Sequence, residues 1–229
     1  MTKIVEPPIL YLGTPVLFIS TLNLDGSANL SPMSSAWWLG WSCMLGLDAS
    51  SKTTENLLRD HEGVLNLPSA GLVGAVDRLA LTTGSDPVPR HKVFMGYRYE
   101  PDKFTASGLT PVPSDEVRPP RVAECPVQLE AVVEEVRPLA RNDRHMLIPV
   151  VTVEARIVRV HVDDSILMPG TSDRIDPEKW RPLIMSFRQF FGLGPILQSS
   201  RLSQFPEEIF APQKETSKRK DSLQAATSS

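Results

Sequence analysis

The sequence predicts a mainly β fold with a few helices and at least six strands, which is enough to close a barrel. Runs rich in β-branched and aromatic residues recur along the chain, separated by turn residues. The 21 prolines against 13 glycines favour many chain reversals over a helical bundle. The 229 residues, 41% hydrophobic and 22% charged, suffice for one well-cored domain.

The first predicted strands lie close together in the N-terminal quarter. Residues 15–23 are rich in β-branched and aromatic side chains, and the Asp-Gly dipeptide that follows suits a hairpin turn. Strands are predicted over about 27–38 and 42–48, with Gly40 at the turn between them. Because these connections are short, the three strands are expected to form an antiparallel meander.

The pattern then becomes mixed. A helix is predicted at 50–60, because small hydroxyl residues precede an apolar pair, as at a helix N-terminus. A short strand at 64–67 and a helical spacing of apolar residues at 72–81 follow. Further on, 127–136 and 146–162 are typical of strands.

Residues 82–124 are rich in proline and carry few regular signals. A stretch that long inside a compact domain is usually functional, so we expect it to cover a ligand or to reach a partner subunit. Arg90, His91 and Lys92 within it are candidate phosphate contacts, and solvated loop residues are the alternative.

Residues 1–211 are predicted to form the domain and residues 212–229 a disordered tail, which has few apolar side chains. The net charge of −3 gives no reason to expect a nucleic-acid or anionic membrane surface. No apolar run reaches the roughly 18 residues of a membrane span, and the first residues lack the apolar core of a signal peptide. A soluble, cytoplasmic protein is therefore expected, with Cys43 and Cys125 as thiols and Cys43 buried.

Several catalytic signatures are missing from the sequence. It has no Gly-x-Ser-x-Gly elbow, no P-loop and no dinucleotide fingerprint after a strand. The histidines at 61, 91, 145 and 161 lack helical ligand spacing, so no metal site is predicted. No catalytic side chain is predicted either.

Two segments together suggest a mononucleotide pocket. In residues 29–38, small side chains at 34–36 leave backbone groups approachable by a flat polar ring, beside aromatic residues. Residues 50–53, at a helix start, offer free N–H groups, hydroxyls and one cation to a phosphate. Each segment alone is more typical of an ordinary strand or N-cap than of a ligand site. It is their combination, one strand apart, that predicts the pocket.

A series of segments, taken in order, carries a more specific resemblance. They are residues 15–21 with 25–26, 29–35, 51–57, 64–67, 102–104 with 107–109, 124–130 and 187–192. In order and spacing they resemble the flavin reductase-like, flavoredoxin-type family of FMN-binding proteins, over roughly residues 10–195. The resemblance implies a six-stranded antiparallel split β-barrel that forms a homodimer, with one FMN per subunit near the interface.

The resemblance also implies where FMN binds. The cofactor-binding residues expected from it are Asn29, Met33, Ser34, Ser35, Ala36, Trp37, Ser50, Ser51, Lys52, Thr53, Asn56 and Arg188. Backbone groups of 33–36 would hold the isoalloxazine ring, and 50–53 with Asn56 the phosphate. Trp37 would wall the flavin or belong to the core. Arg188 would neutralise flavin or nucleotide charge, or form a surface or dimer salt bridge. A structural role is expected for Asn66.

In activity, the resemblance implies an FMN-dependent oxidoreductase that transfers a hydride from NADH or NADPH to flavin, the cofactor carrying the chemistry. Reduced flavin would then serve a partner oxygenase or another electron acceptor. Two alternatives stand beside this: an FMN-binding electron carrier of the flavoredoxin type without its own NAD(P)H oxidase activity, and a structural barrel that binds no flavin.

Overall fold

The computed structural model describes residues 1–143 and 145–205. The chain divides into two compact units, Met1–Pro195 and one that starts at Ile196. The described part of the second unit contains a short 3-10 helix, η3, at Arg201–Gln204. The predicted tail, 212–229, lies outside the described residues. In the part of the chain that is described, no helix has the length and apolar character of a membrane span.

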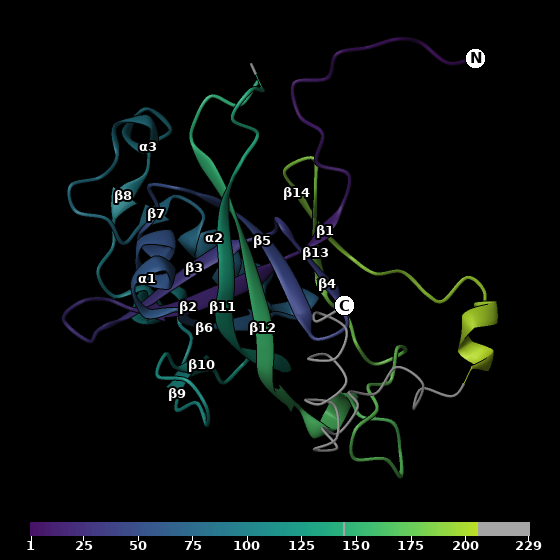
Figure 1. Ribbon diagram of the computed structural model, residues 1–229. Helices are drawn as coiled ribbons and strands as arrows, with labels where there is room; N and C mark the ends of the chain where they lie inside the picture. Colours follow the sequence, from purple (N-terminus) through teal and green to yellow (C-terminus); the bar gives the residue numbers. More distant parts are fainter. Residues whose placement is uncertain (144, 206–229) are drawn as a thin grey trace, which may run out of the picture. The chain divides into compact units, whose positions relative to one another are not determined.

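The first unit is built around one antiparallel sheet of seven strands in the order β3-β2-β6-β11-β12-β5-β4 (Figure 1). These strands are β2 (Leu17–Leu22), β3 (Ala28–Met33), β4 (Ala36–Leu39), β5 (Ser42–Asp48), β6 (Glu62–Leu67), β11 (Val127–Leu139) and β12 (Val150–Val162). The long β11–β12 hairpin runs through the middle of the sheet.

The sheet closes on itself because β3 and β4, its two edges, are halves of one extended run. The first half pairs with β2 and the second with β5, and the N–H of Gly46 donates to the C=O of Ser35 at 2.7 Å between them. With β3 and β4 taken as one broken strand, the barrel has six strands, which confirms the predicted split barrel. The meander pairings are also confirmed, but the predicted strand 27–38 is interrupted at residues 34–35.

The remaining elements are short. They are β1 (Thr14–Pro15), α1 (Lys52–Asp60), η1 (Ala70–Leu72), α2 (Val73–Leu79), β7 (Thr82–Thr83), α3 (Arg90–Phe94), β8 (Arg98–Tyr99), α4 (Lys103–Ser107), β9 (Pro111–Val112), β10 (Arg121–Val122), η2 (Asp164–Ile166), β13 (Leu183–Ser186) and β14 (Gln189–Gly192). The region 82–124 thus has only short pieces of regular structure, as its proline content predicts.

Two apolar clusters result from the alternation of side chains along β2. Leu17 and Ile19 point into the barrel, whereas Phe18 joins a second cluster that packs against α2 and α4. Cys43 belongs to the barrel cluster and Cys125 to the second, both as free thiols. Burial raises the pKa of Cys43 to about 12, so this thiol is structural and unreactive, as the sequence predicts.

Helix α1 begins where the sequence predicts. The side chain of Ser51 accepts a hydrogen bond from the N–H of Thr54 and so caps the helix. Leu57 packs into the barrel cluster. Gly63 allows this, because a Cβ there would lie 3.0 Å from a methyl carbon of Leu57. The packing fixes the first turn of α1 beside the outer face of β5.

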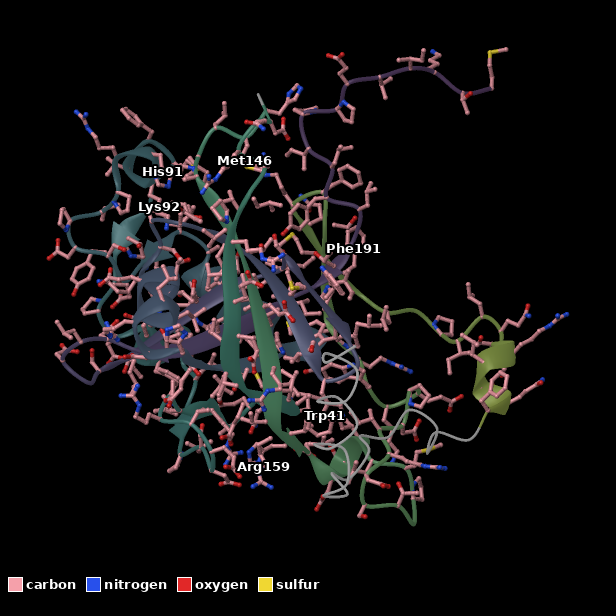
Figure 2. All side chains as sticks on the ribbon, in the orientation of Figure 1. Trp41, His91, Lys92, Met146, Arg159 and Phe191 are labelled. Carbon is pink, nitrogen blue, oxygen red and sulfur yellow. The ribbon has the colours of Figure 1, made fainter. Side chains whose placement is uncertain are left out.

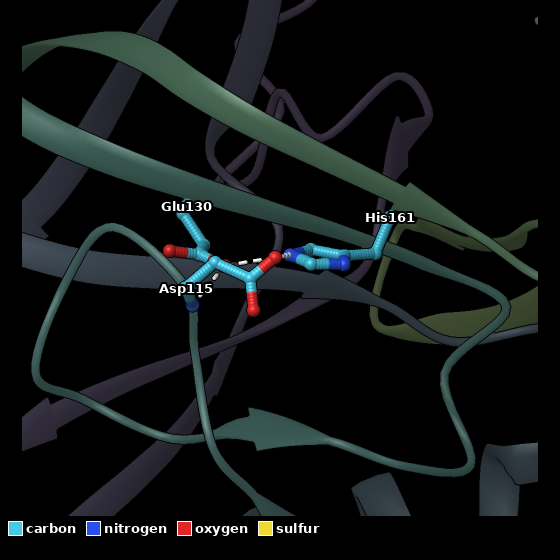
Figure 3. A group of neighbouring side chains, drawn as sticks. All are labelled: Asp115, Glu130 and His161. Carbon is cyan, nitrogen blue, oxygen red and sulfur yellow. Dashed lines mark hydrogen bonds and ion pairs between the residues drawn. The ribbon is translucent and has the colours of Figure 1, made fainter.

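The connection between β9 and β10 is held down by a buried carboxylate, Glu130 of β11 (Figure 3). Its oxygens accept hydrogen bonds from the N–H groups of Asp115 (2.9 Å), Glu116 (2.6 Å) and Val117 (3.1 Å) and from Nε2 of His161 (2.6 Å). Burial alone would raise the pKa of Glu130, but these donors outweigh it and the pKa lies below its ordinary value. The cluster therefore stabilises a loop.

We expect Glu130→Gln to lower the free energy of unfolding by about 2–3 kcal/mol, since hydrogen bonds to a buried charge are the strong ones. Urea unfolding measures this. Glu135→Gln, on the same strand but solvent-exposed, is the matched control and should cost about 0–1 kcal/mol. Because the pKa of Glu130 is lowered on folding, its contribution should disappear as the pH falls below its ordinary value of 4.5. Equal effects of the two substitutions at neutral pH would contradict this role.

Candidate functional site

Two cavities meet at Gly46 on the outer face of β5. Cys43, Leu45 and Leu47 point into the barrel, so Met44, Gly46 and Asp48 face outward. Because Gly46 has no side chain, Ser35 packs closely over it, and an added Cβ would lie 3.2 Å from Cβ of Ser35. Gly46 lines a cavity of about 250 Å³ on the Asp48 side and one of about 410 Å³ on the Met44 side.

The cavity on the Asp48 side, which we call the lysine cavity, is lined by three lysines from three different elements. Lys52 opens α1, Lys92 lies in α3 and Lys103 opens α4. Lys52 pairs with Glu55 at 2.7 Å, and Lys92 with Asp48 at 3.1 Å. The site therefore concentrates positive charge that is only partly neutralised.

Lys103 is the unusual member of the three. It is 3% exposed, and its ammonium group makes no hydrogen bond or ion pair with any residue that the structure describes. Burial, reinforced by the positive charge of Lys92 and opposed by Glu100, lowers the pKa of Lys103 to about 8. A buried ammonium without a partner is costly, and an anion in the cavity would remove that cost.

Asp48 fixes the other side of the lysine cavity. Its carboxylate accepts from the N–H and hydroxyl of Ser50 (both 2.8 Å), from Nε2 of His91 (3.0 Å) and from Nζ of Lys92 (3.1 Å). Burial opposes ionisation, but these donors lower the pKa of Asp48 to about 2. Asp48 thus ties α3 to the loop before α1. Figure 2 shows His91 and Lys92 at the same end of the barrel as Met146, in the β11–β12 connection.

The start of α1 completes the lysine cavity. Ser51, Lys52 and Thr53 all line it, and the first N–H groups of a helix have no partner within the helix. The hydroxyl of Thr54 donates to the C=O of Asp48 at 2.8 Å, which holds the turn against β5. Helix-start N–H groups and converging lysines are a suitable cradle for a phosphate.

The cavity on the Met44 side, which we call the aromatic cavity, has a different character. Tyr11 and Trp37 line it together with Leu10, Leu12, Thr14, Ser35, Ala36, Met44, Leu45, Gly46, Leu139 and Thr152. None of these side chains is charged. An apolar, partly aromatic wall with a few hydroxyls is suited to a flat ring system.

The structure brings most of the sequence-predicted residues to these cavities. Met33, Ser51, Lys52 and Thr53 line the lysine cavity, and Ser35, Ala36 and Trp37 the aromatic one. Ser34 lies between the two strands of the broken run, with its hydroxyl bonded to Tyr11. Ser50 is exposed and bonds to Asp48.

Two predicted residues lie behind the lysine cavity. The Nδ2 group of Asn29 donates to Thr53 (3.1 Å) and to Thr21 (3.2 Å), and Nδ2 of Asn56 donates to Thr21 (3.0 Å) and Asn23 (3.0 Å). Both asparagines are buried. These hydrogen bonds therefore tie α1 to β2 and β3.

The last predicted residues are Arg188 and Asn66. Arg188 is exposed in the β13–β14 turn with φ of 65°. Asn66 is buried and accepts from the N–H of Val122 at 2.8 Å, which supports the structural role expected for it.

Sequence reasoning missed three residues of the site. Lys103 stands in a segment that carried the resemblance, but nothing in its spacing shows that it is buried and unpaired. Tyr11 precedes the first strand by sequence yet meets Ser34 and Ser35. Gly84 approaches the site so closely that a Cβ would lie 2.6 Å from Oδ1 of Asn29.

One cluster of carboxylate and imidazole groups has ligand atoms close enough together for a metal ion. Among the described residues, Asp115, Glu130 and His161 are the group whose ligand atoms lie within 4.8 Å of one another. Both carboxylate oxygens of Glu130 already accept backbone N–H groups, so a metal would have to displace the hydrogen bonds that anchor the loop.

Fold and cavities together define a split barrel with a lysine-lined cavity beside an uncharged, largely apolar one. The chain belongs to the family of the flavin reductase like domain, whose model matches residues 10–194. This membership supports a flavin-linked redox function. A protein of Bacillus subtilis (strain 168), YdfE, is 40% identical over 192 residues, which cover 84% of this chain and 89% of that protein.

Solved structures share the fold at lower identity. Flavoredoxin of Desulfovibrio vulgaris (Miyazaki F) has a TM-score of 0.71 at 22% identity and covers 90% of this chain and 100% of its own. Nitrilotriacetate monooxygenase component B from Bacillus cereus has a TM-score of 0.65 at 20% identity, and the match covers 82% of this chain and 88% of that one. An FMN-binding domain of a flavin reductase-like enzyme from Shewanella baltica OS155 has a TM-score of 0.60 at 16% identity, and the match covers 82% of this chain and 90% of that one.

We expect Gly84→Ala to lower the free energy of unfolding by about 1–3 kcal/mol, because its Cβ would collide with Asn29 and crowd the stem of Lys52 at 3.2 Å. Gly74→Ala, in α2, is the control, since its Cβ would meet only Arg78 at an ordinary 3.5 Å. That change should be neutral or stabilising by about 0.5–1 kcal/mol. Urea unfolding compares the two, and a tolerated Gly84→Ala would show that this approach is not tight.

Proposed function

We propose that the protein binds FMN along the outer face of β5. We call the lysine cavity and the aromatic cavity together the groove. The unpartnered ammonium of Lys103 carries this proposal, because it would pair with an anionic group at the lysine end of the groove. Lys52, Lys92 and the first N–H groups of α1 would hold the phosphate with it. A terminal phosphate distinguishes FMN from riboflavin, so the cradle favours the phosphorylated flavin.

The isoalloxazine ring would lie beyond Gly46, toward the aromatic cavity. Residues 34 and 35 stand outside the β3 and β4 pairings, and apart from the C=O of Ser35, which accepts from Gly46, their backbone groups would serve the polar edge of a ring. Ala36 and Trp37 would contact its apolar part. Gly46 lines both cavities, and a side chain there would displace Ser35.

We propose further that the protein is an NAD(P)H:flavin oxidoreductase. FMN, when bound, supplies the chemistry by accepting a hydride from NADH or NADPH. The chain contributes orientation, a water-poor apolar wall and positive charge near the phosphates. Arg90, beside the buried Lys92 in α3, remains a candidate contact for the nicotinamide nucleotide. Reduced flavin would then serve an acceptor. An oxygenase is one such acceptor, given the fold shared with a monooxygenase component.

A homodimer is part of the proposal. Three large apolar side chains of the β4–β5 hairpin are exposed: Trp37 (58%), Leu39 (76%) and Trp41 (44%). An apolar patch of this kind is typical of an interface. The cytoplasmic location stays a prediction from the sequence.

The second candidate is an electron carrier that keeps FMN bound without oxidising NAD(P)H. It is favoured by the fold shared with a flavoredoxin. The two candidates predict the same flavin site and differ only in the electron donor.

A visible absorption scan of the protein with FMN, made anaerobically, distinguishes these candidates. For the reductase, adding NADH or NADPH should bleach the flavin band much faster than with free FMN. The donor that acts identifies the nucleotide. A bound flavin that stays oxidised until dithionite is added would leave the carrier. Failure to retain any flavin would contradict both.

Lys103→Gln should weaken FMN binding by about 10- to 100-fold, the value of a charge-assisted hydrogen bond in a buried site. Titration by flavin fluorescence measures the Kd. Riboflavin, which lacks the phosphate, should bind equally to the wild type and to Lys103→Gln. Lys179→Gln, an exposed lysine elsewhere, is the control and should change neither Kd.

The pH dependence gives an independent check on Lys103. Its pKa is about 8 without ligand, and a bound phosphate would raise it, so binding takes up a proton above that pH. The Kd for FMN should therefore increase by about tenfold between pH 7 and pH 9. The Kd for riboflavin should stay constant over that range. The same slope for both flavins would exclude Lys103 as a phosphate contact.

A further inference from the structure

Tyr11 reaches the ring end of the groove from outside the barrel. Its carbonyl accepts hydrogen bonds from the N–H of Phe187 at 2.8 Å and from the hydroxyl of Ser186 at 3.4 Å. The segment 10–12 is thereby fastened to the turn between β13 and β14. This attachment leaves the Tyr11 side chain free to extend toward the broken strand.

The Tyr11 hydroxyl bridges the two residues at which the strand is broken. It lies 2.8 Å from the hydroxyl of Ser34 and 2.8 Å from the hydroxyl of Ser35. The ladder of β3 ends at Met33 and that of β4 begins at Ala36. Apart from the bond that the C=O of Ser35 accepts from Gly46 of β5, the two serines lie outside these ladders, and the phenol supplies two further bonds that fix them.

The same residue forms a wall of the aromatic cavity, with Leu10 and Leu12 on either side of it in the chain. The hydroxyl of Thr14, also in this wall, is buried without a hydrogen-bond partner among the described residues. The N-terminal segment thus contributes apolar surface and hydroxyls to the cavity. It does so from residues that precede the first strand of the barrel.

We propose that Tyr11 is a positioning residue for the isoalloxazine ring. By bonding Ser34 and Ser35 at once, its hydroxyl holds their backbone in the conformation that meets the ring, and segment 10–12 closes the ring end of the groove. This inference rests on the proposed flavin site and adds a residue and a segment to it. Tyr11 touches the groups that would hold the ring and acts through them.

A simple tether of the N-terminal segment is the competing explanation for these bonds. A tether would leave flavin affinity unchanged when the hydroxyl is removed. A positioning residue would change the affinity for the ring itself, whatever is attached to the ring. The comparison of FMN with riboflavin separates the two.

The test is Tyr11→Phe in the full chain, with Tyr99→Phe as the control for loss of a phenol on β8. We expect the Kd to increase by about tenfold for FMN and by the same factor for riboflavin, which corresponds to about 1.4 kcal/mol. The absorption band of the bound flavin should also shift. Lys103→Gln should affect FMN alone, so the two substitutions report on opposite ends of the groove.

A ligand-free measurement keeps the inference independent of flavin affinity. Hydrogen–deuterium exchange at residues 33–37 should be faster in Tyr11→Phe than in the wild type or in Tyr99→Phe. The double substitution Tyr11→Phe with Ser35→Ala should weaken riboflavin binding by less than the product of the single effects, because both remove the same bond.

Three results would overturn the inference. Wild-type flavin affinity and spectrum in Tyr11→Phe would show a tether only, with the flavin site itself intact. A loss confined to FMN would place Tyr11 at the phosphate end. A wild-type protein that binds neither flavin would remove the proposed function and this inference with it, and is recognised by the failure of the Tyr99→Phe control as well.

Discussion

The hydrogen bond from Gly46 N–H to Ser35 C=O is the constraint on which the site depends. It extends the pairing of β4 with β5 by one residue, up to the point where the run 28–39 is broken and the chain passes from one edge of the sheet to the other. An unbroken strand would use its backbone groups in the ladder. The break takes residues 34 and 35 out of the β3 and β4 ladders except for this one bond, and the glycine opposite leaves room for the Ser35 side chain. Barrel closure and ligand access are therefore achieved at one place.

The charged side chains of the groove lie at one of its ends. Asp48 neutralises Lys92 and draws α3 onto the barrel, so the region 82–124 contributes to the cavity although it has little regular structure. Lys52 is paired on α1, and Lys103 is left without a partner. Positive charge gathers at one end of β5, and none lines the cavity at the other. A molecule with an anionic tail and a flat apolar body matches this polarity.

Local patterns in the sequence were enough to predict the strands and the cap at Ser51, because alternation and capping depend on neighbours in the chain. The break at 34–35 was not predictable, since it depends on pairing with β2 on one side and β5 on the other. Nor could the sequence show that Asn29 and Asn56 face Thr21 and Thr53, or that Tyr11 meets Ser34. Such contacts join residues that are far apart in sequence, and only the closed barrel brings them together.

The state of Lys103 also bears on the third possibility, a barrel that binds nothing. A structural barrel has no use for an unpaired ammonium in its interior, because an apolar side chain of similar length would fill the space without the desolvation cost. The lowered pKa of Lys103 is a measure of that cost in the ligand-free chain. Pairing with a bound anion would remove this desolvation cost, which would strengthen binding of the anion. The bound anion would in turn stabilise the folded state by mass action. A buried, unpaired ammonium at one end of the groove and an uncharged wall at the other thus support the proposal of an amphipathic anion such as FMN.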